Sequence, residues 1–183
     1  VAGVEPQSET VWRQADKYGV PRICFVNKMD RGGADFFRCV EEVRERLGGN
    51  PIPLQIPIGA EDEFAGVVDL INNRGIAWNE EDQGMTWTEI PIPEDLLSTV
   101  AEWREKLVEA VAETNDELME KFFEDPESIT EREVLDCLRE ATIAGKVVPM
   151  MCGSAFKNKG VQAMLDMVME ILPSPLDTEA IVG

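Results

Sequence analysis

The chain of 183 residues contains no histidine, and its four cysteines include no C-x-x-C pair. These absences argue against a zinc site and a disulfide framework, because both depend on suitably spaced thiols or imidazoles. No apolar run approaches the ~20 residues that cross a membrane, and no basic and apolar leader opens the sequence. We therefore expect a cytoplasmic protein with reduced thiols and no membrane contact.

Basic residues are scarce: 17 lysines and arginines stand against 36 aspartates and glutamates, which gives a net charge of −19. Such a chain repels a phosphate backbone, so we expect no direct grip on nucleic acid from it. Residues 94–145 hold 16 of the acidic and only 5 of the basic side chains. This acidic segment is either a solvated helical face or a docking surface for a basic partner.

The sequence also lacks G-x-x-x-x-G-K-[ST], the glycine-rich loop that cradles nucleotide phosphates. Its single Gly-Lys pair, Gly145-Lys146, precedes a predicted strand, whereas in that motif the pair follows a strand. The chain therefore contains no phosphate cradle of this kind.

Hydrophobic periodicity predicts a parallel α/β unit that is interrupted by an insertion. The predicted elements are a helix over 6–18, a strand over 23–26, a helix with the apolar stripe Phe36, Val40, Val43 and Leu47, a strand from Val147, and a helix over 160–172 with the stripe Val161, Leu165, Val168 and Leu172. About a hundred residues separate the second helix from the second strand, which is too many for one crossover.

The insertion, residues 51–145, is predicted to be an α+β subdomain. It opens with an edge strand that contains two prolines, and further short extended runs over 65–70, 75–78 and 85–90 suit a small antiparallel sheet. Helices follow from Glu94, and the first of them carries Glu105, Glu109 and Glu113 on one face. The predicted fold class is thus α/β, with a parallel sheet from 1–50 and 146–183.

Two polar loops follow the two strands of the predicted parallel sheet, where ligands of such sheets bind. Asn27-Lys28-Met29-Asp30 follows the first strand, and Ser154-Ala155 follows the second. The carboxylate of Asp30 can accept hydrogen bonds from the ring imino group and the exocyclic amine of guanine together, whereas adenine has no such donor pair. A site built around this acceptor pair rejects bases that leave it unpaired.

The other loop residues have matching roles in this prediction. The stem of Lys28 can lie along the base, and Asn27 can tie neighbouring loops together. The Ser-Ala loop can offer a backbone N–H to the guanine carbonyl oxygen, while the Ser154 hydroxyl orients Asp30. Taken alone, the first loop could instead be an ordinary strand-to-helix connection with capping residues.

The sequence resembles the translational GTPases and, among them, the elongation factor G family. The resemblance covers the whole chain and is carried by residues 6–10, 26–31, 66–70, 152–162 and 172–175. It implies that Asn27, Lys28, Asp30, Ser154 and Ala155 recognise the base of GTP or GDP. It also implies that the phosphate loop, the Mg²⁺ ligands and the catalytic histidine lie upstream of Val1. The chain would then be the second half of a GTP-binding domain, inactive by itself.

The resemblance further implies that the intact protein hydrolyses GTP on the ribosome and couples this to movement of tRNA and mRNA. It assigns the insertion to the G-prime subdomain, which is implicated in contact with the ribosomal stalk protein, and it places Glu109 and Glu113 at that contact. Two alternatives stay open: an interaction module with vestigial guanine loops, and a sister GTPase such as a ribosome-protection or release factor. We also expect the isolated chain to self-associate through an open sheet edge at Ile23.

Overall fold

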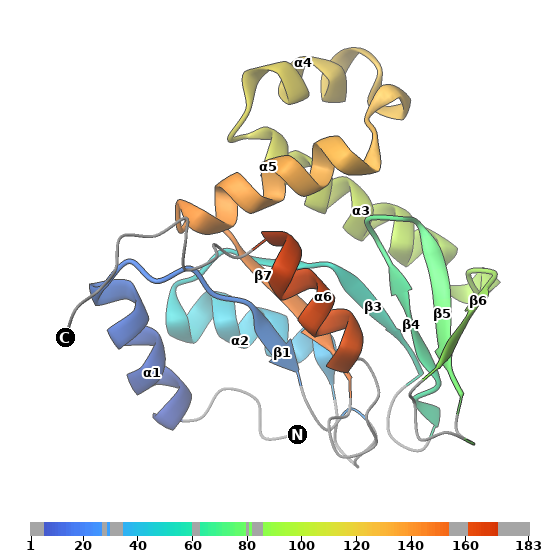
Figure 1. Cartoon of the computed structure of the whole chain (residues 1–183), viewed down its shortest axis with the longest axis horizontal. Helices are drawn as coiled ribbons and strands as arrows, with labels where there is room; N and C mark the ends of the chain where they lie inside the picture. Colours follow the sequence, from blue (N-terminus) through green and yellow to red (C-terminus); the bar gives the residue numbers. More distant parts are fainter. Residues whose placement is uncertain are drawn as a thin grey trace.

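The computed structural model describes residues 6–26, 29, 35–59, 63–79, 81, 86–153 and 161–171. They form a parallel and an antiparallel sheet side by side, with helices packed around them (Figure 1). The parallel sheet has the order β1-β7-β2, with β1 at Cys24–Val26, β7 at Val148–Cys152 and β2 at Pro51–Pro53. The antiparallel sheet runs in chain order through β3 (Gln55–Ile58), β4 (Gly66–Asp69), β5 (Arg74–Trp78) and β6 (Trp87–Ile90). The predicted mixed α/β fold class is confirmed.

Helices cover both faces of the parallel sheet. They are α1 (Pro6–Lys17), α2 (Phe36–Leu47), α3 (Leu97–Ala112), α4 (Asp116–Glu124), α5 (Glu131–Ile143) and α6 (Val161–Ile171), with short 3-10 turns at Glu94–Leu96 and Pro126–Ser128. In Figure 1, α6 lies in front of β1 and β7 and α2 lies behind them, while α3, α4 and α5 form the upper part of the molecule.

Local sequence signals begin and end these helices. The side chain of Asp35 accepts a hydrogen bond from the Arg38 N–H at the start of α2, and Gly48 ends the helix with φ +68°. At α5, the Thr130 hydroxyl accepts from the Glu133 N–H, and the two side chains also bond each other. These are the caps that such residues form at helix ends, and Thr130 with Glu133 forms a capping box.

The strands of the parallel sheet bury alternate residues in two cores. On β7, Val148, Met150 and Cys152 pack in the core that contains Trp12 of α1 and Val40 of α2. Met151 faces the other core, with residues of α3 and α5. Both cores also contain side chains of the antiparallel sheet, such as Val67 and Val68 of β4, which follow each other in sequence. The two sheets are therefore packed as one unit.

The parallel sheet extends into the segment predicted as an insertion. We expected the insertion to begin at Pro51, but Pro51–Pro53 forms β2 and pairs with β7. The single edge strand predicted here is divided at Leu54, and its first part, β2, lies at the edge of the described parallel sheet. Leu54 donates its N–H to β7, so positions 51 and 53, two nitrogens without hydrogen, face the outer side. The division at 51 and 145 remains a prediction about how the chain is organised.

The predicted core stripe of the last helix is partly wrong. Of the predicted stripe, Val168 is half-buried but Leu165 is 48% exposed. Met167, which is not in the stripe, packs against the core that contains Met151, and Met169 is 83% exposed. Residues two positions from Met167 lie about 200° around a helix, so they point away from the face that it buries. The side chains of Val161, Met164 and Leu172 lie outside the described residues.

Candidate functional site

The two strands that precede the predicted loops, β1 and β7, are neighbours in the parallel sheet, and their ends lie side by side. In the parallel pairing of β1 with β7, Val26 lies opposite Cys152. The five residues predicted to recognise the base, Asn27, Lys28, Asp30, Ser154 and Ala155, lie outside the described residues. The chain immediately before each loop is described, so the structure shows where both loops begin.

Backbone hydrogen bonds extend this pairing past the strands. The N–H of Gly153 donates to the Val26 carbonyl oxygen at 3.0 Å, and the N–H of Met29 donates to the Gly153 carbonyl oxygen at 3.1 Å. Met29 is 1% exposed and packs in the same core as Cys152. The first loop is thus anchored at its third residue to the residue just before the second loop. Both loops start side by side at the carboxyl edge of the sheet.

A buried glutamine holds the other side of β7. Gln55 of β3 is 4% exposed, and its Oε1 accepts a hydrogen bond from the Cys152 N–H at 3.3 Å. Gln55 is not among the site residues predicted from the sequence. The signal was available, because Gln55 is the one amide side chain within the apolar run 52–58, and a polar group in a core must find a partner.

The cysteines near the loop starts are neutral thiols. Burial raises the pKa of Cys24 to about 11, although the nearby Arg22 opposes this effect. Burial also raises the pKa of Cys152 above its ordinary value. Neither thiol contributes a charge to this edge of the sheet near neutral pH, and neither is a nucleophile there.

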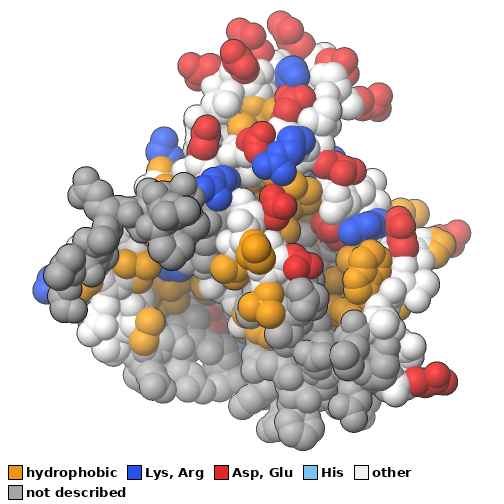
Figure 2. All heavy atoms as spheres, in the orientation of Figure 1, with side chains coloured by type: hydrophobic (Ala, Val, Ile, Leu, Met, Phe, Trp, Pro, Cys, Tyr) orange, Lys and Arg blue, Asp and Glu red, His pale blue; other side chains and the backbone are white. Residues whose placement is uncertain are grey.

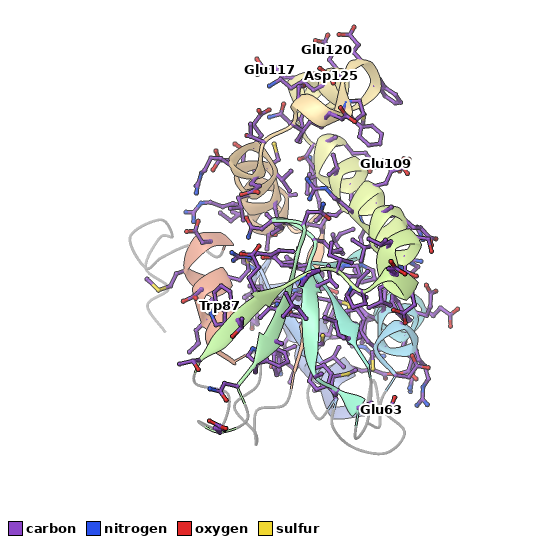
Figure 3. The ribbon with its side chains drawn as sticks, turned by 90° about the vertical axis from the view of Figure 1, so that its right-hand side faces the viewer. Glu63, Trp87, Glu109, Glu117, Glu120 and Asp125 are labelled. Carbon is purple, nitrogen blue, oxygen red and sulfur yellow. The ribbon has the colours of Figure 1, made fainter. Side chains whose placement is uncertain are left out.

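A second candidate site is the acidic face of α3. Glu105, Glu109 and Glu113 are exposed, and Glu109 projects outward in Figure 3. Within the described part of the chain, none of the three forms an ion pair. Like charges four residues apart destabilise a helix by about 0.2–0.5 kcal/mol per pair. The three like charges therefore lower the stability of α3 by a small amount.

A groove of about 200 Å³ borders the acidic face, between α3, β2 and the end of α2. Its apolar lining comes mainly from Trp103, Leu107, Ala110 and the residues of β2, and its charged rim consists of Arg44, Lys106, Glu109 and Glu113. Lys106 lies 4.2 Å from the centre of the Trp103 ring and pairs with Glu102. The two carboxylates thus stand beside an apolar depression, an arrangement that suits contact with another protein.

Acidic side chains also crowd the upper part of the molecule. Figure 2 shows Asp and Glu gathered there, and Figure 3 labels Glu117, Glu120 and Asp125 around α4. The acidic side chains of residues 94–145 therefore lie on the surface of α3, α4 and α5.

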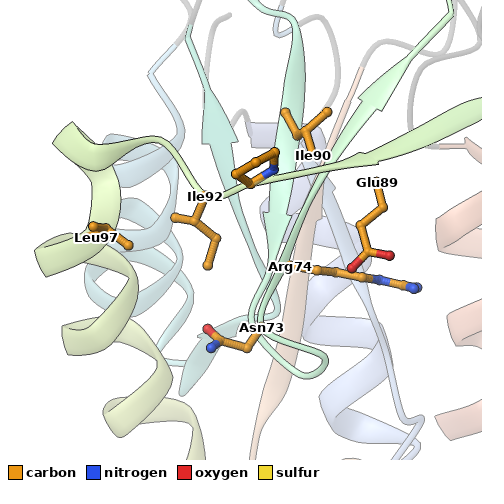
Figure 4. A pocket seen from close by; sticks show the side chains of 7 residues that line it. Asn73, Arg74, Glu89, Ile90, Ile92 and Leu97 are labelled. Carbon is orange, nitrogen blue, oxygen red and sulfur yellow. The ribbon is translucent and has the colours of Figure 1, made fainter.

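A wider hollow of about 530 Å³ lies between the β4–β5 turn, β6 and the start of α3 (Figure 4). Its charged residues are Arg74 and Glu89. The Nε of Arg74 lies 3.8 Å from the Oδ2 of Asp69, and its Cζ lies 5.0 Å from the centre of the Trp87 ring. Ile92 and the half-exposed Leu97 line its apolar part. The hollow therefore offers an apolar contact surface, and its one basic side chain, Arg74, already has partners within the protein.

Among the described residues, no group of three or more aspartate, glutamate, cysteine or histidine side chains is arranged to hold a metal ion. No helix in the described part of the chain is long and apolar enough to cross a membrane.

Comparison with known proteins identifies the family. Residues 1–174 match the family model described as the elongation factor Tu GTP binding domain. The chain belongs to this family. A GTP-binding domain implies GTP and GDP as its ligands, in agreement with two loops that begin side by side at the carboxyl edge of a parallel sheet.

Two similar curated proteins are both named elongation factor G, one from Amoebophilus asiaticus and one from Cytophaga hutchinsonii. Each is 63% identical over all 183 residues, and the chain spans 26% of the length of each. A crystal structure of a Thermus thermophilus protein is also similar, with a TM-score of 0.83 and 28% sequence identity. The match covers 95% of this chain and 25% of the Thermus thermophilus chain. The resemblance to elongation factor G is confirmed.

Proposed function

We propose that this chain recognises the guanine base of GTP and GDP through the loops after β1 and β7. The observation that supports this most directly is the backbone bridge from Val26 through Gly153 to Met29, because it brings the two loop starts together. A base held between two loops needs both at a fixed separation. A backbone bridge provides this without depending on any side chain.

In this proposal, the loop residues divide the edge of the base between them. Asp30 accepts from the ring imino group and the exocyclic amine, and Lys28 lies along the base. Asn27 ties the loops together, the backbone at Ala155 donates to the carbonyl oxygen, and Ser154 orients Asp30. The nucleotide phosphates and Mg²⁺ supply the reacting groups when bound, and these five residues act only on the base.

We further propose that the chain is part of a longer protein that hydrolyses GTP on the ribosome to drive movement of tRNA and mRNA. Two relatives named elongation factor G, 63% identical over the whole chain, favour this over a ribosome-protection or release factor. Residues 1–50 and 146–183 would belong to the GTP-binding domain, and residues 51–145 would form the G-prime insertion. We call this longer protein the intact protein.

The test of base recognition is Asp30→Asn in the intact protein. An amide replaces one acceptor with a donor, so GTP should bind at least tenfold more weakly and XTP should bind better. Titration with both nucleotides measures the change. Asp35→Asn is the matched control, because it removes a charge nearby and asparagine also caps helices well. Unchanged GTP binding with no gain for XTP in Asp30→Asn would remove Asp30 from this role.

A second function is proposed for the acidic face of α3. Glu109 and Glu113 border the groove beside Trp103 and form no ion pair within the described residues, so they can meet basic side chains of a partner. In a ribosomal GTPase, the partner we propose is the stalk protein. If the guanine loops were vestigial, this docking would be the chain's sole activity, and GDP titration separates the two possibilities.

A further inference from the structure

Leu54 is the residue at which the chain passes from one sheet to the other. Its N–H donates to the Met150 carbonyl oxygen in the parallel sheet at 2.9 Å, and its carbonyl oxygen accepts from the Leu70 N–H at 3.0 Å, at the end of β4. The parallel ladder therefore stops here. The antiparallel sheet begins at the next residue, Gln55.

Because the chain changes sheet here, β7 loses one backbone hydrogen-bond acceptor. Val148 donates to the Asn50 carbonyl oxygen, and the ladder advances two residues at a time on each strand, so Cys152 would donate to the carbonyl oxygen of Leu54. That oxygen instead faces Leu70. The buried N–H of Cys152 then needs another acceptor, since an unsatisfied buried donor is costly. The Gln55 side chain supplies it at 3.3 Å.

Gln55 is itself held in place by its sheet. It pairs with Asp69 across β3 and β4, and Asp69 in turn accepts hydrogen bonds from the N–H groups of Ile71 and Asn72. Arg104 of α3 donates to the carbonyl oxygens of Leu70 and Ile71. The acceptor that meets β7 is thus fixed by the antiparallel sheet and by α3.

We propose that Gln55 is a positioning residue for the second guanine loop, through which the antiparallel sheet sets how well the Ser154-Ala155 backbone meets the base. This rests on the proposed guanine recognition. Cys152 lies two residues before Ser154, and its neighbour Gly153 is held by β1 on the opposite side. With Gln55 absent, β7 keeps one lateral hydrogen-bond partner at this end instead of two, and the loop start loses its fixed position.

The experiment combines a side-chain change with a change of one atom in the ligand. Gln55→Met keeps the length of the side chain but removes the amide acceptor, and it is made in the intact protein. Binding of GDP is compared with binding of 6-thioguanosine diphosphate, which replaces the carbonyl oxygen, and of inosine diphosphate, which lacks the exocyclic amine. We expect the wild-type protein to prefer GDP over the thio analogue by roughly tenfold, the value of one hydrogen bond.

In Gln55→Met, the preference for GDP over the thio analogue should fall to about twofold or less, an estimate that follows from losing most of that hydrogen bond. The preference over inosine diphosphate, which reports on Asp30, should stay as in the wild type. A general loss of stability would weaken all three nucleotides together. Thr142→Val is the matched control: it removes another buried polar side chain, whose hydroxyl donates within its own helix to Leu138, and it should leave both preferences unchanged.

Gln55→Glu keeps an acceptor of the same reach and should retain the wild-type preferences. The proposal is overturned if folded Gln55→Met keeps the wild-type preference over the thio analogue, or if folded Gln55→Glu loses it. If neither variant folds, amide hydrogen exchange of the wild-type protein is the test. If Gln55 accepts its hydrogen bond, the Cys152 N–H must exchange as slowly as the Met150 N–H. A fast-exchanging Cys152 N–H overturns the proposal. A wild-type protein with no preference for GDP over either analogue refutes guanine recognition itself, a different failure.

Discussion

Gly66, the first residue of β4, shows how closely the antiparallel sheet is packed at the scale of a single residue. A Cβ atom added there would lie 2.0 Å from the carbonyl oxygen of Ile76 on β5. The obstacle is backbone, which cannot move aside without breaking the strand pairing. Gly48 has a different constraint: its φ is +68°, but nothing lies within 4 Å of an added Cβ.

We predict that Gly66→Ala destabilises the protein by more than about 2 kcal/mol, because the overlap must displace a strand of the core. Gly48→Ala should cost only about 1 kcal/mol, the strain of a left-handed residue at a helix end. Urea denaturation of both variants measures the difference. Equal midpoints for the two variants would show that the overlap at Gly66 costs no more than the left-handed strain at Gly48, and would contradict the prediction.

At the scale of one element, α3 combines a buried stripe with a charged face. Val100, Leu107 and Val111 are buried, while Glu109 and Glu113 are exposed beside the groove. Reversing the charge of the two glutamates should leave the buried stripe intact, because both side chains are exposed. Position 109 then attracts Glu105 instead of repelling it, while positions 109 and 113 still carry like charges. The exchange therefore changes the surface and spares the core.

We predict that Glu109→Lys combined with Glu113→Lys slows association of the intact protein with the ribosomal stalk protein. Charge steers such contacts, so the loss should be largest at low salt and should shrink as salt screens the surface. Stalk-dependent GTPase stimulation across a salt series is the measurement. Glu117→Lys with Glu120→Lys on α4 is the control for net charge and should have the smaller effect. Full stimulation in the α3 variant at low salt would exclude this face.

At the scale of the whole molecule, the described parallel sheet ends at β1, whose outer side pairs with no other described strand. Ile23 and Phe25 there are half-buried, and no charge or proline interrupts the run 23–26. Unpaired N–H and C=O groups beside apolar side chains are a template for pairing with another chain. The net charge of −19 opposes this at a distance.

We predict that the 183-residue chain by itself self-associates, and that association strengthens with added salt. Repulsion between exposed charges is screened beyond ~8 Å at physiological salt, whereas strand pairing acts on contact. Light scattering or analytical ultracentrifugation across a salt series at roughly 0.1 mM protein, within the range where association-prone species aggregate, tests this. A monomer at every salt concentration would mean that the outer side of β1 is covered.

We also predict that the 183-residue chain alone hydrolyses no GTP and binds GDP more weakly than micromolar. A phosphate-binding lysine, Mg²⁺ and backbone amides around the phosphates carry most of phosphoryl transfer, and the sequence has no phosphate loop to provide them. Calorimetry with GDP and a turnover assay measure both quantities. Turnover above buffer, or a micromolar dissociation constant, would contradict this prediction.

Local chemistry determined what the sequence by itself could predict. The apolar stripe of α2, the acidic face of α3 and the polar residues after two apolar runs each depend on side chains within a few positions of one another. The motifs at 26–31 and 152–162 were sufficient to predict the family before any strand was placed.

The tertiary structure alone decided how distant segments meet. β2 joins the parallel sheet, Gln55 reaches the backbone of a residue 97 positions away, and α6 turns Met169 outward. Each outcome depends on which buried groups lack a partner once the strands are assembled. Leu54 gives its carbonyl oxygen to Leu70, so Cys152 must find its acceptor in a side chain, because a buried N–H cannot be left without one.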